Sequence, residues 1–331
     1  MLGNKWALRI TFVSALLAFA VILLGATTRL KEAGLGCPDW PGCYGQLIVP
    51  HQPISSVFAG QKLNSEKAWT EMIHRYAVAI LALLSFTAVI LILQQRKLPH
   101  QPVNIAFIFL ILLFFQGLLG KWTVTLRLHP LVVMSHLLGG LTLLSVLWML
   151  ILRLTPIFRD YPSNQEKKLR LLAALGLFII VLQITLGGWT SSNYAAFVCP
   201  DFPGCQGHWW PRMNFSEGFN VWLDANRNFE GGLLSIDART AIQVSHRIGA
   251  LITALYLIFL AWRLRKISKK KILRVISLLL LIFLTLQITL GILNVIWLLP
   301  LSIAVAHNGV AALLLLTLLS LNLYLNQKAI S

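Results

Sequence analysis

The sequence predicts an all-α integral membrane protein with eight transmembrane helices. Of its 331 residues, 57% are hydrophobic and only 12% are charged, whereas ordinary soluble domains carry about 25% charged residues. The mean hydropathy is +0.75. Apolar segments of some 20 residues span a hydrocarbon core roughly 30 Å thick. We place eight of them at residues 8–30, 71–94, 103–125, 131–153, 170–190, 240–262, 273–295 and 300–324.

The basic residues are distributed as a membrane orientation requires. With the N-terminus inside, the inner segments hold 17 Lys and Arg against two acids, whereas the outer segments hold 11 against nine. This is the positive-inside rule, so both termini are expected in the cytoplasm. The densest basic cluster, residues 263–274, is interpreted as an anchor to anionic lipid. The net charge of +17 therefore does not indicate nucleic-acid binding.

The first apolar segment is interpreted as a retained span. Lys5 and Arg9 precede it, and the small residues of Ala18-Phe19-Ala20 are typical of a signal-peptidase site. Cleavage there would cut through the middle of the apolar run, so the segment is predicted to stay in the protein.

The chain is an internal repeat of four spans plus four. The segment CPDWPGC at 37–43 returns as CPDFPGC at 199–205, an offset of 162 residues. An even number of spans per repeat makes the halves parallel, and we expect two four-helix bundles related by a pseudo-two-fold axis along the membrane normal. The predicted parts are a first half at 1–155, a cytoplasmic linker at 156–169 and a second half at 170–331.

Four histidines occupy equivalent places in the two halves. His74 returns as His246 after 172 residues, and His136 returns as His307 after 171. Ionisable residues within spans are rare and usually functional. All four lie near the start of inward-running spans, in the outer part of the membrane. Two facing imidazoles in each bundle suit one planar metal complex, so we predict two bis-histidine haem sites. The other histidines lack this pattern and are expected at the surface: His51, His100, His129 and His208.

Glu71 distinguishes the first half from the second. It lies three residues before His74, one helical turn away, so a carboxyl and an imidazole can address one ligand together. Its counterpart is Gln243, which cannot exchange a proton at ordinary pH. A helix-start acid that interacts with the helix dipole is the alternative interpretation. We favour a reactive first half in which Glu71 delivers or removes protons, and a second half that holds a cofactor.

Arg75 and Arg247 each follow a candidate ligand. Near the outer surface, their guanidinium groups can pair with haem propionates or simply extend to the membrane interface, and the sequence leaves both interpretations open. Gln116 and Gln287 are expected to form hydrogen bonds between helices.

All four cysteines lie in two outer loops, as the pairs Cys37 with Cys43 and Cys199 with Cys205. On an oxidising side of the membrane, such pairs form disulfides. A zinc finger normally needs closer spacing and more ligands. We therefore favour one disulfide in each loop.

Three motifs together resemble the haem A synthase family. They are GATTRL at 25–30, GLGCPDWP at 34–41 and ExxHR at 71–75. Gly42 departs from the family pattern, in which a larger apolar residue is expected. The resemblance extends over nearly the whole chain, because the remaining ligand positions are matched by His136, His246 and His307.

The resemblance implies an enzyme that oxidises the C8 methyl of haem O to a formyl group by successive hydroxylations, giving haem A for terminal oxidases. It implies a haem B cofactor in the second half. The first cysteine pair is implied to be a disulfide or redox-active pair beside the reactive site, with the second pair as its structural counterpart. By position, the implied catalytic residues are Glu71, His74 and His136, and the implied haem B ligands are His246 and His307.

The expected surroundings combine this resemblance with the composition and the charge distribution. Haem O and the synthase that supplies it, an electron donor that the sequence does not identify, membrane lipid and a second copy of the chain are the expected partners. The expected location is the plasma (inner) membrane, with the cysteine loops and haem sites toward the outer side.

Two other functions fit part of the pattern. A di-haem carrier that takes electrons from quinol uses the four histidines without modifying haem, with Glu71 as a quinol proton acceptor. A thiol-disulfide exchange protein uses the cysteine pairs and predicts no haem in the purified protein, but it leaves the matched histidines unexplained.

Overall fold

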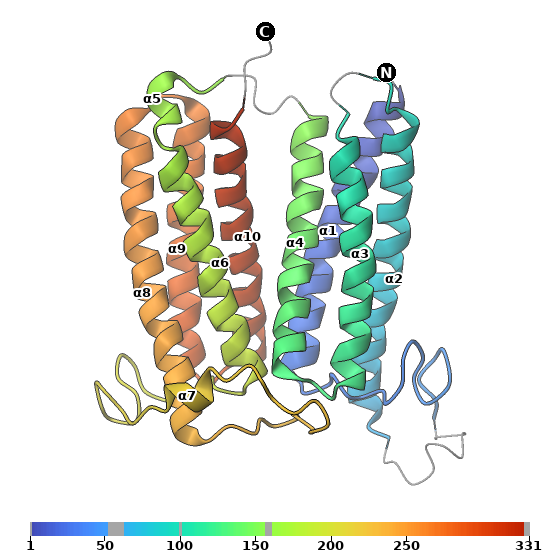
Figure 1. The fold of residues 1–331 in the computed structure, drawn as a ribbon, viewed down its shortest axis with the longest axis vertical. Helices are drawn as coiled ribbons and strands as arrows, with labels where there is room; N and C mark the ends of the chain where they lie inside the picture. The colour runs from blue at the N-terminus through green and yellow to red at the C-terminus, as the bar shows by residue number, and fades with distance from the viewer. Residues whose placement is uncertain (1, 52–62, 99–100, 156–160, 328–331) are drawn as a thin grey trace. The chain divides into compact units, whose positions relative to one another are not determined.

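The computed structural model describes residues 2–51, 63–98, 101–155 and 161–327, and these ranges contain helices but no strands (Figure 1). Eight helices are long and apolar enough to cross a membrane, which confirms the predicted spans. They are α1 (Leu2–Leu30), α2 (Ser65–Gln94), α3 (Val103–Thr125), α4 (Pro130–Leu154), α6 (Arg170–Ser192), α8 (Ile236–Ile267), α9 (Lys271–Ile296) and α10 (Leu301–Leu325). Two short helices, α5 (Asn164–Lys167) and α7 (Phe215–Gly218), lie outside the spans.

Helix α2 begins before its apolar run, at Ser65 rather than at the predicted residue 71. A polar cap is the reason, because the side chain of Asn64 accepts a hydrogen bond from the backbone N–H of Lys67. Glu71 therefore lies well inside the helix. Since the dipole effect fades within the first turn, the interpretation of Glu71 as a helix-start acid is wrong.

The chain divides into two compact units. Unit 1 comprises Met1–Leu154 and Asn220–Leu233, and unit 2 comprises Thr155–Phe219 and Leu234–Ser331. In unit 1, α1 packs against α2 and α4, and α3 packs against α4 and α2. In unit 2, α6 packs against α8 and α10, and α9 packs against α10 and α8. Each unit is thus a bundle of four spans with the same neighbours, while the pseudo-two-fold axis stays a prediction.

The predicted linker at 156–169 is described only in part. Residues 156–160 lie outside the described ranges, and Asn164–Lys167 form the short helix α5.

Tight turns join the last two spans of each unit. Arg127 and Leu128, which follow α3, have φ values of 46° and 62°, and Leu298 and Leu299, which follow α9, have 53° and 61°. Two successive left-handed residues reverse the chain within a few positions. The next span therefore runs back beside the previous one, which brings the histidine of α4 or α10 against α3 or α9.

Residues 220–233, from the long loop between α6 and α8, pack with α1 to α4 in unit 1. The backbone N–H of Phe229 donates to the carbonyl of Arg127 (3.1 Å), and its ring meets the edge of the His129 ring at a centroid distance of 4.9 Å. Nε2 of His129 lies 3.4 Å from the carbonyl oxygen of Leu223.

His129 is consequently 7% exposed, and its predicted surface position is wrong. The cover comes from a segment almost 100 residues further along the chain. His51 and His208 are exposed as expected, and His100 lies outside the described ranges.

A buried carboxylate links α5 to the segment between α8 and α9 in unit 2. Oε2 of Glu166 accepts from the backbone N–H of Ser163 (2.7 Å) and pairs with Nζ of Lys270 (3.0 Å), while the Ser268 hydroxyl donates to Oε1. Burial alone would raise the pKa of Glu166, but the hydrogen bonds from Ser268 and Ser163 and the Lys270 ammonium outweigh it and lower the pKa below 4.5.

This pKa shift predicts a pH-dependent stability. Because the folded-state pKa of Glu166 lies below its unfolded value, the stabilisation is present above about pH 4.5 and is lost as the pH falls through the folded-state pKa. Glu166→Gln should lower the free energy of unfolding by roughly 1.5–3 kcal/mol at pH 7, the value of hydrogen bonds to a charged group. The difference from the wild type should shrink below pH 4.5.

Unfolding of the detergent-solubilised protein, followed by circular dichroism between pH 7 and pH 3.5, measures this effect. Glu66→Gln is the control, because the Glu66 side chain is 78% exposed and its ion pair with Lys31 contributes little. A stability loss in Glu166→Gln that does not change with pH would contradict the assignment.

Candidate functional site

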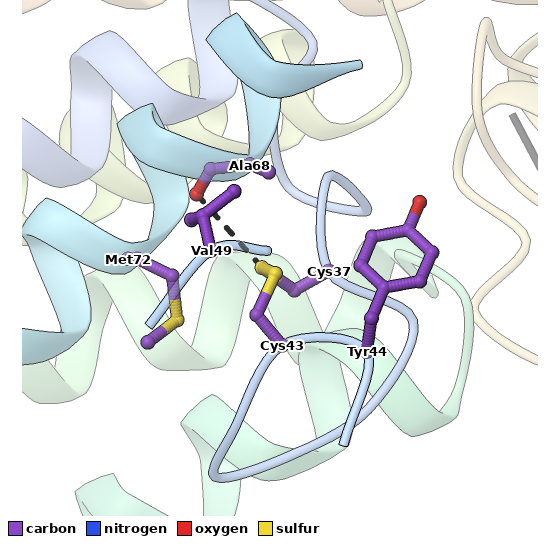
Figure 2. Close-up of a cluster of buried hydrophobic side chains, with 6 residues drawn as sticks. All are labelled: Cys37, Cys43, Tyr44, Val49, Ala68 and Met72. Carbon is purple, nitrogen blue, oxygen red and sulfur yellow. Dashed lines mark hydrogen bonds between the residues drawn. A yellow bond between two sulfur atoms is a disulfide. The ribbon is translucent and has the colours of Figure 1, made fainter. Parts of the chain in front are cut away.

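Both cysteine pairs form disulfides, as predicted, with Cα–Cα distances of 4.8 Å for Cys37–Cys43 and 4.6 Å for Cys199–Cys205. The first disulfide packs on α2 in a cluster of buried side chains (Figure 2). The backbone just before Cys37 lies close to the backbone of α2, because a Cβ added at Gly36 would lie 2.6 Å from the carbonyl oxygen of Lys67. The members of this cluster are Cys37, Cys43, Tyr44, Val49, Ala68 and Met72.

Arg75 attaches the first cysteine loop to α2. Its Nη1 donates to the carbonyl oxygens of Asp39 (2.9 Å), Pro41 (3.2 Å) and Gly42, and its Nη2 pairs with Glu71. One guanidinium presents several donors in a fixed plane, which matches a ring of inward-turned carbonyls.

Arg247 makes the corresponding contacts from α8. Its Nη1 donates to Pro203 (3.4 Å) and Gly204, and its Nη2 donates to Cys199 (2.9 Å). The structure thus gives both arginines a role that the sequence did not suggest, and their pairing with haem propionates stays a prediction.

An aspartate in each cysteine loop accepts two hydrogen bonds from the backbone of the same loop. The carboxylate of Asp39 accepts from the backbone N–H groups of Tyr44 (2.6 Å) and Gly45 (2.9 Å). Asp201 accepts in the same way from Gln206 (2.6 Å) and Gly207 (3.0 Å). The hydrogen bond from the Gly207 N–H is the main reason that the pKa of Asp201 lies below its usual 3.8. Sequence reasoning missed these residues, although their repetition after each Cys-Pro pair was the available signal.

Glu71 and Gln243 differ in their partners as well as in their chemistry. Glu71 is 4% exposed, and its Oε2 accepts from the backbone N–H of Cys37 (2.9 Å) while Oε1 binds Arg75. Gln243 is 5% exposed, and its Oε1 has no hydrogen-bond partner in the described part of the chain. The first unit therefore connects its disulfide loop to a buried carboxylate, one turn from His74.

Each of the four predicted ligands packs against a glycine of a neighbouring helix. A Cβ at that glycine would lie 3.1 to 3.3 Å from Cε1 of the imidazole, so only glycine lets the ring edge contact the helix backbone without a shift. Within unit 1, His74 is in electrostatic range of His136, and within unit 2 His307 is in range of His246. The glycine and histidine pairs are Gly25 with His74, Gly120 with His136, Gly187 with His246 and Gly291 with His307.

These residues fit a haem better than a metal ion held by side chains alone. Among the described residues, no three or more His, Cys, Asp or Glu side chains are arranged so that they could hold a metal ion, whereas a haem brings four ring nitrogens and needs only two axial ligands. Buried polar atoms without partners normally mark a missing contact. Among the four predicted ligands, Nδ1 of His74, His136 and His307 is buried without a partner in the described ranges, and the same holds for Nδ1 of His129, which is outside this set.

Glutamines from neighbouring helices contact three of the histidines. Nε2 of Gln116 donates to the carbonyl of His136 (2.8 Å), and Nε2 of Gln287 lies 3.1 Å from Nε2 of His307. Both bonds join helices, as predicted. A third, from Gln183 to His246, was missed, because its repeat counterpart is Val21 and repetition therefore gave no signal.

The fold and these side chains define a multi-pass helical membrane protein with two disulfide loops and a histidine pair in each of two units. The chain belongs to the COX15-CtaA family of cytochrome oxidase assembly proteins, whose family model matches residues 8–319.

Curated relatives agree with this membership. The chain is 48% identical to the Heme A synthase of Shewanella oneidensis over 331 residues, covering 98% of both chains. It is 27% identical to that of Shouchella clausii over 228 residues, covering 66% of this chain and 70% of the relative. It is 25% identical to that of Flavobacterium psychrophilum over 346 residues, covering 96% and 97%.

The attachment by Arg247 predicts a change in the accessibility of the second disulfide. Arg247→Ala should speed reduction of Cys199–Cys205 about tenfold or more, since each hydrogen bond from a charged donor contributes roughly 1.5–3 kcal/mol. Cys199 and Cys205 are both buried at present. The rate follows from mass-resolved maleimide labelling after timed exposure to a phosphine reductant.

Arg212→Ala is the matched control, because Arg212 is an exposed residue of the same outer loop. Equal reduction rates in Arg247→Ala and Arg212→Ala would show that the carbonyl contacts do not protect the disulfide.

Proposed function

We propose that this protein is a haem A synthase, a membrane oxidoreductase that converts the C8 methyl of haem O to the formyl of haem A by successive hydroxylations. One observation carries the proposal. A chain of this family, 48% identical over nearly its full length to a Heme A synthase, places a histidine in the same glycine contact four times, two in each unit.

The first unit is proposed to hold the substrate. His74 and His136 would bind the iron of haem O, and Glu71 would hold or move a proton at its carboxyl oxygens. The position of Glu71 supports this role, because it is buried, one turn from His74, and fixed by the Cys37 N–H and Arg75. A fixed carboxyl is oriented before the substrate arrives, which is what efficient proton transfer requires.

The second unit is proposed to hold the resident haem B through His246 and His307. That haem, when bound, supplies electron transfer. Gln243 in place of Glu71 removes the proton-exchanging group there. Nε of Arg247 is buried without a partner in the described ranges, so it is the donor that a haem propionate would engage.

The proposed location is the plasma (inner) membrane with both disulfide loops on the outer side. The excess of Lys and Arg in the inner segments and the two disulfides support this orientation. The proposed partners are haem O with the synthase that supplies it, an electron donor and membrane lipid.

The deciding experiment is to purify the protein from cells that also make haem O, extract the non-covalent haems and separate them by mass. Haem B together with haem A or its hydroxylated precursor is the expected result. Haem B alone, with haem O available, would instead indicate a di-haem electron carrier. No haem at all would favour thiol-disulfide exchange.

Glu71→Gln tests the proposed proton-transfer residue. The variant should keep haem in the second unit but lose conversion of haem O by roughly 10²-fold or more, the usual contribution of a general acid or base. The amide keeps an acceptor for the Cys37 N–H, so the loop is largely retained. Glu66→Gln on the same helix, where the side chain is exposed, is the control. Full activity in Glu71→Gln would remove this residue from the mechanism.

His246→Ala and His307→Ala test the proposed cofactor ligands. Each should abolish the low-spin haem spectrum of the second unit, since each variant lacks one of the two proposed axial imidazoles. His208→Ala, which removes an exposed histidine from the same half, should leave the spectrum intact. An unchanged low-spin spectrum in either ligand variant would refute that ligand assignment.

A further inference from the structure

The side-chain amide of Gln183 on α6 contacts both the ring and the main chain of His246. Its Nε2 lies 3.0 Å from Nδ1 of His246 and 3.0 Å from the main-chain oxygen of the same residue. The space for this amide comes from Gly249, where any Cβ would clash with Oε1 of Gln183. The amide thus occupies space that exists because Gly249 of α8 has no side chain.

The first unit lacks this arrangement. At the repeat offset of 162, Val21 stands where Gln183 stands, and at the offset of 172 Ala77 stands where Gly249 stands. Nδ1 of His74 is buried and has no partner in the described ranges. Both halves of the contact, the amide and the space for it, are therefore absent beside His74.

Gln116 does not replace this contact in the first unit. It reaches only the main-chain carbonyl of His136, at 2.8 Å, and Nδ1 of His136 has no partner in the described part of the chain. Neither imidazole of unit 1 is therefore oriented by an amide at its Nδ1.

The chemistry of the amide suits a ligand that must not move. When iron takes Nε2 of an imidazole, the proton resides on Nδ1, and an acceptor at Nδ1 fixes the ring orientation and makes the ligand more basic. A carboxamide has both a donor and an acceptor. Oε1 of Gln183 is buried without a partner in the described ranges. A half-turn of the amide presents Oε1 to the Nδ1 proton and gives up the hydrogen bond from Nε2 to the main-chain oxygen of His246.

We propose that Gln183 is a positioning residue that fixes His246 and so makes the second unit retain its haem, whereas Val21 leaves His74 free to release haem from the first unit. The inference rests on the proposed function and deepens it. A synthase must release its product and keep its cofactor, and the two units differ at this contact in the required direction.

The test compares Gln183→Leu, Gln183→Glu and wild type, each purified with its own haem. Transfer of haem B to excess apomyoglobin should be about 10 to 100 times faster from Gln183→Leu, the usual effect of losing such a partner on metal affinity. The midpoint potential of the low-spin haem should rise in Gln183→Leu. It should fall in Gln183→Glu, whose carboxylate is a stronger acceptor.

Gln116→Leu is the matched control, because it removes an amide that touches only a main-chain carbonyl. The second-unit potential and transfer rate should be those of the wild type. The converse variant, Val21→Gln with Ala77→Gly, should slow haem release from the first unit.

The outcomes separate the two proposals. If the wild type carries no haem B, the proposed function fails. If the wild type carries it but Gln183→Leu has the wild-type transfer rate and potential, this inference fails while the proposed function stands. Loss of haem in Gln183→Leu with retention and a lowered potential in Gln183→Glu would support the positioning role, since a general folding defect would not lower the potential.

Discussion

The attachment of each disulfide loop to a span by one arginine is the interaction on which the rest of the site depends. A polar loop has no intrinsic reason to lie against a particular turn of an apolar helix. The carbonyls bound by Arg75 and Arg247 provide that reason. Each arginine follows a histidine in sequence, so the contact that holds the loop also sets the position of the loop relative to that histidine.

The same scaffold serves two units that differ at few positions. Glycine contacts to the imidazoles are alike in both, to within 0.2 Å. The differences lie among the residues around the histidines: the second half has Gln243 where the first has Glu71, and Gln183 where the first has Val21. The proposed proton exchange and the proposed fixing of a haem ligand thereby fall to different units, although the helix packing around the histidines is alike.

The sequence alone predicted the eight spans, the repeat and the disulfides, because local composition or residue spacing indicates each of them. It did not predict the partners of Glu71, since a long-range hydrogen bond to a loop leaves no periodic trace. Burial of His129 was missed for the same reason. Gln183 was missed because the repeat was the guide, and Gln183 is a place where the two halves differ.

The packing of residues 220–233 on unit 1 bears on the order in which the protein is made. A ribosome delivers α1 to α4 first, yet Phe229, which covers His129, emerges only after α6 and α7. The first unit is therefore completed late in synthesis, when one of the four spans of the second unit, α6, is already present. A gene divided between α4 and α6 would place this cover on a separate polypeptide. The first four spans made alone would therefore lack the segment that covers His129.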